Sequence, residues 1–152
     1  MIAPRRAILD CYGQSEDQWD LLKNSAIVYQ LFPNTLLVWQ ADHVEIWKAW
    51  PVGNGVDECI AEASLFAPEP PVTESAQRYW GRNMDLLMRT VDEEDCPTCE
   101  GIHQGLYAGA QAHITFGRNE PGLTHYHRCI REGVGYPPVT PLPLPEEAAA
   151  SK

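Results

Sequence analysis

The sequence predicts an α+β fold in which an antiparallel sheet precedes its helices. Three observations carry this prediction. Four segments between residues 25 and 66 are rich in β-branched and aromatic residues. Turn-forming residues separate these segments, and a long stretch with helical spacing of apolar residues follows them. Because strands and helices do not alternate, a parallel βαβ arrangement is not expected.

The start of the chain is expected to be a lead-in with one short helix. Residues 15–23 (SEDQWDLLK) open on Ser15, a residue type that caps helix N-termini. Acidic residues follow it in the first turn, where they favour a helix. A short helix is therefore predicted within the first 24 residues.

The four expected strands occupy residues 25–31, 35–40, 44–50 and 58–66. A Pro-Asn pair at 33–34 is a turn signal between the first two strands. A Gly-Asn-Gly run at 53–55 breaks the chain before the fourth. Short turns between successive strands predict an antiparallel meander.

The second half of the chain is expected to be helical. Thr73 is a candidate N-cap for a helix whose apolar stripe continues, with interruptions, to Leu106. Pro97 must either kink this helix or begin a second one, with Asp95 before it as a cap. A glycine-containing loop then leads to a last short helix at residues 123–131.

These elements divide the chain into a lead-in (1–24), a folded domain (25–136) and a tail (137–152). The tail is rich in proline and then in alanine, so disorder is expected there. A four-stranded sheet backed by one long helix leaves one edge and part of one face without a partner. The fold is therefore expected to be incomplete, so that the chain either oligomerises or belongs to something larger.

Composition excludes several classes of partner. The chain has 11 Lys and Arg against 21 Asp and Glu, a net charge of −10. Phosphates of nucleic acids and anionic membrane surfaces would repel such a chain. No stretch reaches the roughly 18 apolar residues of a membrane-spanning helix. The five cysteines are odd in number and follow no regular framework, so reduced thiols and a cytoplasmic location are expected.

No complete catalytic or metal site is visible from residue spacing alone. The acidic run at 92–95 is typical of a solvated helix face. Cys96 and Cys99 form a C-x-x-C with His103 nearby, but no second ligand pair stands at zinc-site spacing, so packing thiols are favoured. His125 and His127 would point to different faces of a helix. The five tryptophans are more typical of core packing than of a ligand pocket.

Three segments, taken together, resemble the catalytic domain of the Rieske-type aromatic-ring-hydroxylating oxygenase α-subunits. Residues 29–35 (YQLFPNT), followed by DHVE and WP, resemble part of that family's sheet. Residues 91–106 (VDEEDCPTCEGIHQGL) resemble its acid-rich helix. Residues 116–128 (FGRNEPGLTHYHR) resemble its C-terminal signature. The resemblance spans residues 26–132.

The resemblance implies a helix-grip fold of the START and Bet v 1 type, in which a curved antiparallel sheet wraps a long C-terminal helix. It also implies a mononuclear Fe(II) held by two His and one carboxylate, and a Rieske [2Fe–2S] centre that passes electrons to it. By motif position Asp95 matches the carboxylate, with Asp92, Glu93 and Glu94 as competitors if the register slips.

The chain lacks other parts of that family's pattern. It contains no H-x4-H pair for the iron, and no C-x-H and C-x-x-H pairs for the Rieske cluster. These ligands are expected upstream, so the chain is expected to be a C-terminal catalytic portion that binds iron weakly or not at all by itself. By the same resemblance, Trp39, Trp47, His103 and Gln104 are candidates to line the site.

The resemblance further implies a dioxygenase-type enzyme of aromatic compound catabolism. It would hydroxylate an aromatic or small organic substrate with O2, taking electrons from NAD(P)H through a reductase or ferredoxin. The intact enzyme is expected to be a homo-oligomer, a trimer by resemblance. Two alternatives remain: a non-catalytic helix-grip module that binds an apolar small ligand, and an inactive remnant.

Overall fold

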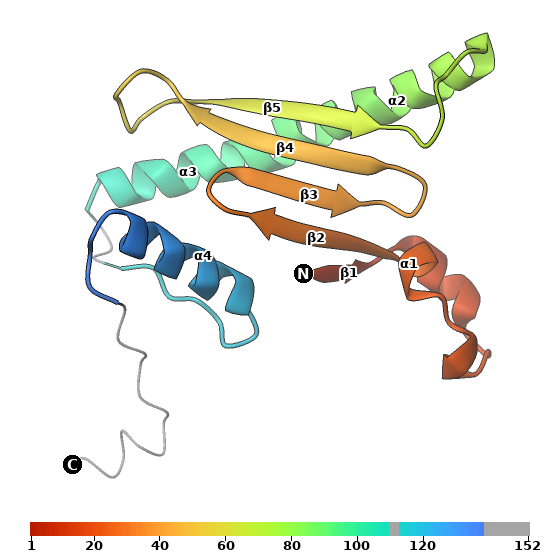
Figure 1. Ribbon diagram of the computed structural model, residues 1–152, viewed down its shortest axis with the longest axis horizontal. Coiled ribbons are helices and arrows are strands. Elements are labelled where there is room, and N and C mark those ends of the chain that lie inside the picture. Colours follow the sequence, from red (N-terminus) through yellow and green to blue (C-terminus); the bar gives the residue numbers. More distant parts are fainter. Residues whose placement is uncertain (110–112, 139–152) are drawn as a thin grey trace. The chain divides into compact units, whose positions relative to one another are not determined.

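The computed structural model describes residues 1–109 and 113–138. The chain divides into two compact units, Met1–Thr115 and Phe116–Lys152, and the first contains the sheet and its long helix (Figure 1). Residues 139–152 lie outside the described part, so the disorder expected for the tail stays a prediction.

Five strands form one antiparallel sheet in the order β1-β2-β3-β4-β5, which confirms the predicted meander. The strands are β1 (Ile2–Pro4), β2 (Ser25–Leu31), β3 (Thr35–Trp39), β4 (Val44–Pro51) and β5 (Cys59–Phe66). Strands β2 to β5 match the four expected segments to within one residue at each end. The additional strand, β1, was not expected because it has three residues and ends in a proline.

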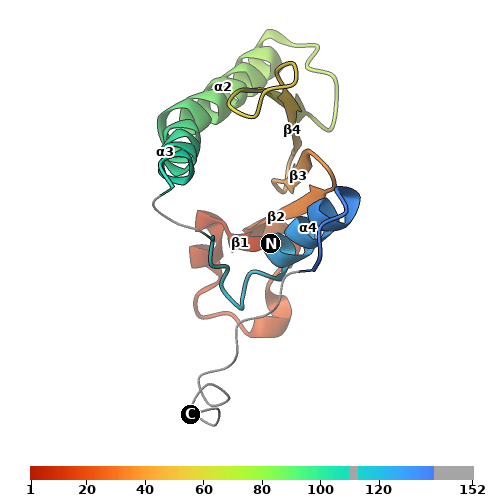
Figure 2. The same ribbon diagram turned by 90° about the vertical axis from the view of Figure 1, so that its left-hand side faces the viewer.

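The long helical region begins where the sequence predicts. It consists of α2 (Glu74–Thr90), a π turn η3 (Val91–Asp95) and α3 (Cys96–Tyr107). The Thr73 hydroxyl accepts a hydrogen bond from the backbone N–H of Ala76 at 3.2 Å, which confirms the predicted N-cap. Figures 1 and 2 show α2 and α3 running along one side of the sheet.

The expectation that Asp95 caps a second helix is wrong. Asp95 has helical dihedrals (φ −75°, ψ −48°), and its side chain makes no capping hydrogen bond. The backbone instead passes through Pro97 without leaving the helical region, because one wider π turn precedes the proline.

The predicted helix at residues 15–23 is broken into two short pieces. These are a 3-10 turn η2 (Glu16–Gln18) and a single α-helical turn α1 (Leu21–Asn24), preceded in the chain by the 3-10 helix η1 (Arg6–Cys11). Ser15 donates its hydroxyl hydrogen bond to Asp17 and so does not cap. Asp20 is the N-cap of α1, and its carboxylate accepts hydrogen bonds from the backbone N–H groups of Leu22 and Lys23.

The second unit contains α4 (Pro121–Gly133), which extends the expected helix by two residues at each end. Pro121 stands at its first position, where a missing N–H costs nothing. Within the described ranges, no helix is long and apolar enough to cross a membrane.

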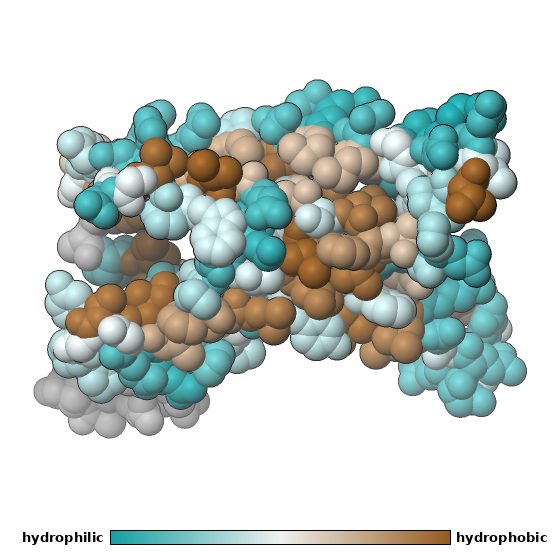
Figure 3. Space-filling view, turned by 45° about the horizontal axis from the view of Figure 1, so that its top comes forward, coloured by the Kyte–Doolittle hydropathy of each residue, from teal (hydrophilic) through white to brown (hydrophobic). Residues whose placement is uncertain are grey.

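The apolar core of this structure is small. Among the described residues, the buried apolar side chains are Cys11 and Ile27, and no large side chain is fully buried. Aromatic and aliphatic side chains of the sheet stay well exposed, including Tyr29 (53%), Ile60 (60%) and Phe66 (54%). Figure 3 shows hydrophobic residues gathered over the sheet. Exposed apolar patches commonly mark contacts with further polypeptide.

We expect Thr73→Ala to destabilise the start of α2. The hydroxyl satisfies an N–H at the helix end that has no partner within the helix. Its loss should lower the free energy of unfolding by about 1 kcal/mol, the usual effect of removing such a cap. Urea unfolding followed by circular dichroism measures the change. Ser75→Ala, within the first turn, is the control and should change the free energy by less than half as much.

Candidate functional site

The acid-rich segment predicted to carry chemistry forms the π turn η3. The backbone N–H of Cys96 bonds to the carbonyl of Val91, five residues back, in place of the usual four. The side chains of Asp92, Glu93, Glu94 and Asp95 are all exposed. The turn therefore presents four carboxylates to solvent near the middle of a helical run of 34 residues, Glu74 to Tyr107.

The position of this π turn has a local cause. A proline in an α-helix lacks the N–H that would bond four residues back, and its ring clashes with that carbonyl. A wider turn just before Pro97 relieves this conflict while the helix continues. Single π turns inside α-helices are rare and occur frequently at functional sites. Pro97 is the signal for this irregularity in the sequence. From the sequence we predicted instead a kink at Pro97 or a second helix with Asp95 as its cap.

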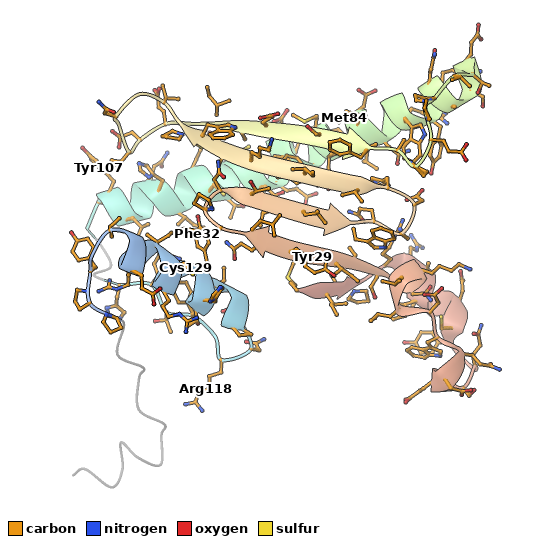
Figure 4. The ribbon with its side chains drawn as sticks, in the orientation of Figure 1. Tyr29, Phe32, Met84, Tyr107, Arg118 and Cys129 are labelled. Atoms are coloured by element: carbon orange, nitrogen blue, oxygen red, sulfur yellow. The ribbon has the colours of Figure 1, made fainter. Side chains whose placement is uncertain are left out.

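A shallow pocket of about 330 Å³ lies between α3 and the loop joining β4 to β5. It is lined by Asp57, His103, Gln104, Tyr107 and Ala108. The Nε2 atom of His103 faces an Asp57 carboxylate oxygen at 3.5 Å, and its ring is tilted against that of Tyr107. Figure 4 labels Tyr107 at this end of α3. Two expected site residues, His103 and Gln104, thus line one pocket.

The other two expected site residues do not lie together. Trp39 is paired with Val44 across β3 and β4. Trp47 is three residues beyond Val44 in the same strand, so its side chain points to the opposite face. Its indole N–H donates to Glu45 at 3.2 Å. Trp39 and Trp47 therefore cannot line one face of a common cavity.

A partly buried polar cluster at the turn between β3 and β4 was not expected. The two ring nitrogens of His43 face two carboxylates: Nδ1 lies 2.8 Å from Asp42, and Nε2 lies 3.4 Å from Glu45. Glu45 is buried and also accepts from Gln40 at 3.1 Å. A buried carboxylate is tolerable because these donors satisfy its oxygens.

The same cluster links the sheet to α2. The hydroxyl of Tyr79 donates to Asp42 at 3.1 Å. The ring of Trp80 meets that of His43 edge-on, with 5.6 Å between centroids. Within the turn, Ala41 has a φ of 66°, which a non-glycine residue rarely adopts. Contacts on both sides hold this turn in place, since such a conformation persists only when its surroundings determine it.

Electrostatics favour the charged form of Asp42. Burial of the Asp42 carboxyl raises its pKa, but hydrogen bonds from His43 and Tyr79 and the nearby imidazole lower it by more. The net pKa lies below the ordinary value of 3.8. A sequence signal for the cluster existed: His43 immediately precedes the strand expected at residues 44–50, and Glu45 lies two residues further on, on the same face if the extended backbone begins at His43. In the sequence His43 stands alone, so we had no reason to expect a cluster around it.

No metal centre is complete in the part of the chain that the structure describes. No group of three or more His, Cys, Asp or Glu side chains there lies close enough to hold an ion. A facial-triad iron site needs three protein ligands around open positions. The acids of η3 therefore offer ligands without forming a site by themselves.

Comparison with known families decides the identity of the domain. Residues 8–135 match the model of the ring-hydroxylating alpha subunit (catalytic domain). The chain belongs to this family. The match includes all three segments on which the resemblance rests, and extends beyond them at both ends. No curated protein and no solved structure shows significant similarity to the chain.

Membership of the ring-hydroxylating family agrees with the observed architecture. An antiparallel sheet with one long helix behind it is consistent with a helix-grip fold. Intact enzymes of the family carry non-haem iron and a Rieske cluster. Asp95, the residue expected from the resemblance to bind iron, lies on η3 inside the matched region.

We expect Asp42→Asn to weaken the attachment of the β3–β4 turn to α2. The depressed pKa means that the charged carboxylate stabilises the folded chain above pH 3.8 and that this contribution is lost as pH falls through the folded value. Because Asp42 is half exposed, the loss at neutral pH should be about 0.5 kcal/mol.

Urea unfolding of wild type and Asp42→Asn between pH 2 and pH 7 measures this difference, which should shrink at the acid end. Asp85→Asn makes the same charge change at an exposed position of α2. It is the control and should show little pH-dependent difference. An equal effect of both substitutions would show that net charge, and not the cluster, is responsible.

Proposed function

We propose that this chain is the carboxylate-bearing portion of an oxygenase catalytic domain. The whole enzyme hydroxylates an aromatic or small organic substrate with O2, using electrons from NAD(P)H delivered by a reductase or ferredoxin. The observation that carries the proposal is the π turn of η3, which falls on the acid-rich motif inside the matched region. A backbone irregularity at the motif where an iron ligand is expected supports a functional role there.

Asp95 is the residue we assign as the iron ligand. A carboxylate supplies negative charge and a hard oxygen donor, both suited to Fe(II). When bound, the iron activates O2 for insertion into the substrate. The described residues do not make that site on their own, since no group of three or more His, Cys, Asp or Glu side chains among them lies close enough to hold an ion. Two histidines from outside the described residues are needed to complete it.

The pocket beside α3 is the part of this chain that we assign to substrate. His103 lies eight residues beyond Asp95, which corresponds to about 12 Å along the helix. Tyr107 and Ala108 offer apolar contact, while His103, Gln104 and Asp57 offer polar groups for orientation. Trp39 and Trp47 lie on opposite faces of the sheet, so they do not line one substrate pocket together.

The exposed apolar side chains support assembly into something larger. The sheet leaves Tyr29, Ile60 and Phe66 more than half exposed, and β5 pairs on one side with β4. An uncovered strand edge and apolar face favour association with further protein. We therefore propose that the chain works within a cytoplasmic homo-oligomer, a trimer by analogy with its family.

One observation favours a second function. The pocket beside α3 is lined mainly by apolar atoms yet contains the Asp57–His103 pair. An apolar lining with a few polar groups is typical of sites for small apolar ligands, and it involves no redox chemistry. A non-catalytic binding module of the helix-grip type is therefore the alternative, and it needs no metal.

We expect this chain alone to bind Fe(II) weakly, because no three potential ligands lie together among its described residues. Anaerobic calorimetric titration with Fe(II) should give no stoichiometric binding at micromolar protein concentrations. Tight one-to-one binding would contradict the assignment of an incomplete site.

The role of Asp95 is tested by co-expressing the chain with the N-terminal portion of a ring-hydroxylating α-subunit, which supplies the histidines. The purified complex should retain iron, and Asp95→Asn should abolish that retention. Glu94→Gln and Glu93→Gln are matched controls on the same turn and should leave iron bound. Loss of iron in a control variant alone would move the ligand to that residue.

A further inference from the structure

The two edge strands of the sheet differ in how well they are protected against pairing with further chains. The first, β1, has three residues and ends in Pro4, and short edge strands with a proline resist such pairing. The second, β5, has eight residues and pairs with β4 along its whole length without a bulge. It contains no proline, and Glu62 is its only charged residue. The outer edge of β5 is therefore unprotected (Figure 1).

The backbone groups on this edge belong to the odd-numbered residues of β5, with Ala61, Ala63 and Leu65 at their centre. Val52 and Glu58 continue the β4–β5 register by one step, and the N–H of Val52 donates to the carbonyl of Glu58 at 3.2 Å. Hydrogen-bonded pairs alternate along antiparallel strands, so the even-numbered residues of β5 bond to β4. The odd-numbered residues point their N–H and C=O groups outward, where no strand of the described residues pairs with them.

The outer edge of β5 is complementary to a second copy of itself. A two-fold axis perpendicular to the sheet keeps each face of β5 on the same side in both copies. Residues opposite each other are then both odd-numbered or both even-numbered. When Ala63 lies opposite its own copy, Ala61 lies opposite Leu65 of the second copy. Each of these pairs exchanges two N–H to C=O hydrogen bonds, so all the outward groups of the three residues find partners.

The side chains of β5 favour the same register. Ile60 and Phe66 are 60% and 54% exposed, and each lies opposite the other across the two copies, in a pair of the kind whose side chains approach most closely. Glu62 lies opposite Ser64, whose hydroxyl can donate to the carboxylate. Sliding one copy by two residues in one direction brings Glu62 opposite its own copy, and like charges there are unfavourable. Sliding it in the other direction leaves Ile60 without an opposite residue in the strand.

We propose that the outer edge of β5 is an interaction surface for a second copy of this chain. The two β5 strands pair antiparallel about a two-fold axis at Ala63, and the two sheets become one continuous sheet. The Trp50–Ile60 pair of one copy then continues into the Phe66–Val44 pair of the other as one apolar row. The proposal does not depend on the oxygenase assignment, because none of these residues belongs to the expected iron site or to the pocket beside α3.

Sedimentation equilibrium of the whole chain at micromolar concentrations tests the proposal. The wild-type chain should form a dimer, and Ala63→Pro should weaken it. Proline is tolerated on an edge strand where its missing N–H would face outward, so β5 should stay paired with β4. Two hydrogen bonds at the centre of the interface are lost and a ring is added there. The dissociation constant of the dimer should therefore rise at least about tenfold.

Ala63→Val is the matched control, because valine is close to proline in size but keeps the outward N–H. It should leave the dimer intact, and circular dichroism shows whether both variants retain the fold. A wild-type chain that stays monomeric overturns the proposal. So does a dimer or trimer that Ala63→Pro leaves intact, because its interface then lies elsewhere. If Ala63→Val dissociates the dimer as fully as Ala63→Pro does, backbone pairing is not responsible and the proposal is again overturned.

Disulfide cross-linking tests the register without a proline in the strand. Chains with Ile60→Cys and chains with Phe66→Cys are mixed and oxidised with a small disulfide, and peptide mass spectrometry identifies the linked positions. A link between positions 60 and 66 of different chains is expected. Ile60→Cys alone should give no link between its two copies of position 60, which lie about 20 Å apart along the strands. The absence of the 60–66 link, or a dominant 60–60 link, overturns the proposal.

Discussion

The backbone hydrogen-bond ladder of the sheet is the constraint on which the first unit depends. Eight consecutive pairs join β4 to β5, and five join each of the pairs β2–β3 and β3–β4. In most domains such a ladder is covered by a packed apolar core. Here, among the described residues, Cys11 and Ile27 are the apolar side chains that are buried. The regular pairing of strands therefore organises this unit more than apolar packing does.

Because apolar burial is slight, a polar cluster has a correspondingly large part in joining the helix to the sheet. Asp42 and His43, in the β3–β4 turn, meet Tyr79 and Trp80 on α2. Hydrogen bonds are directional, so such contacts specify one arrangement where apolar contacts would allow several. The helix that carries η3 is thus attached at its N-terminal end, and the π turn follows about three helical turns beyond that attachment.

The negative charge of η3 also affects a neighbouring thiol. Burial raises the pKa of the Cys96 thiol, and Asp92 and Asp95 of η3 raise it further. The Cys96 thiol is therefore held in its protonated form beside the four exposed carboxylates, which suit a hard cation.

Local sequence was enough to place β2 to β5, the Thr73 cap and the helix α4. Each depends on side-chain alternation, turn residues or caps, which act over a few neighbouring positions. It also carried the family motifs, from which Asp95 was singled out. The tertiary structure decided which distant residues meet: Asp57 with His103, and Asp42 with Tyr79. Such pairs depend on how a sheet and a helix stack, and no periodicity within either segment encodes that.

Tertiary structure also separated Trp39 from Trp47, whereas the π turn found in place of the expected Asp95 cap has a local cause. Strand register determines the separation of the two tryptophans, because the direction of a side chain alternates at every residue. The π turn depends on a balance between the steric clash of the Pro97 ring with the preceding turn and the continuation of a long helix. The identities of the reactive residues were thus already present in the sequence, but their partners were determined by the three-dimensional packing, because contacts between distant segments exist only once those segments are folded against each other.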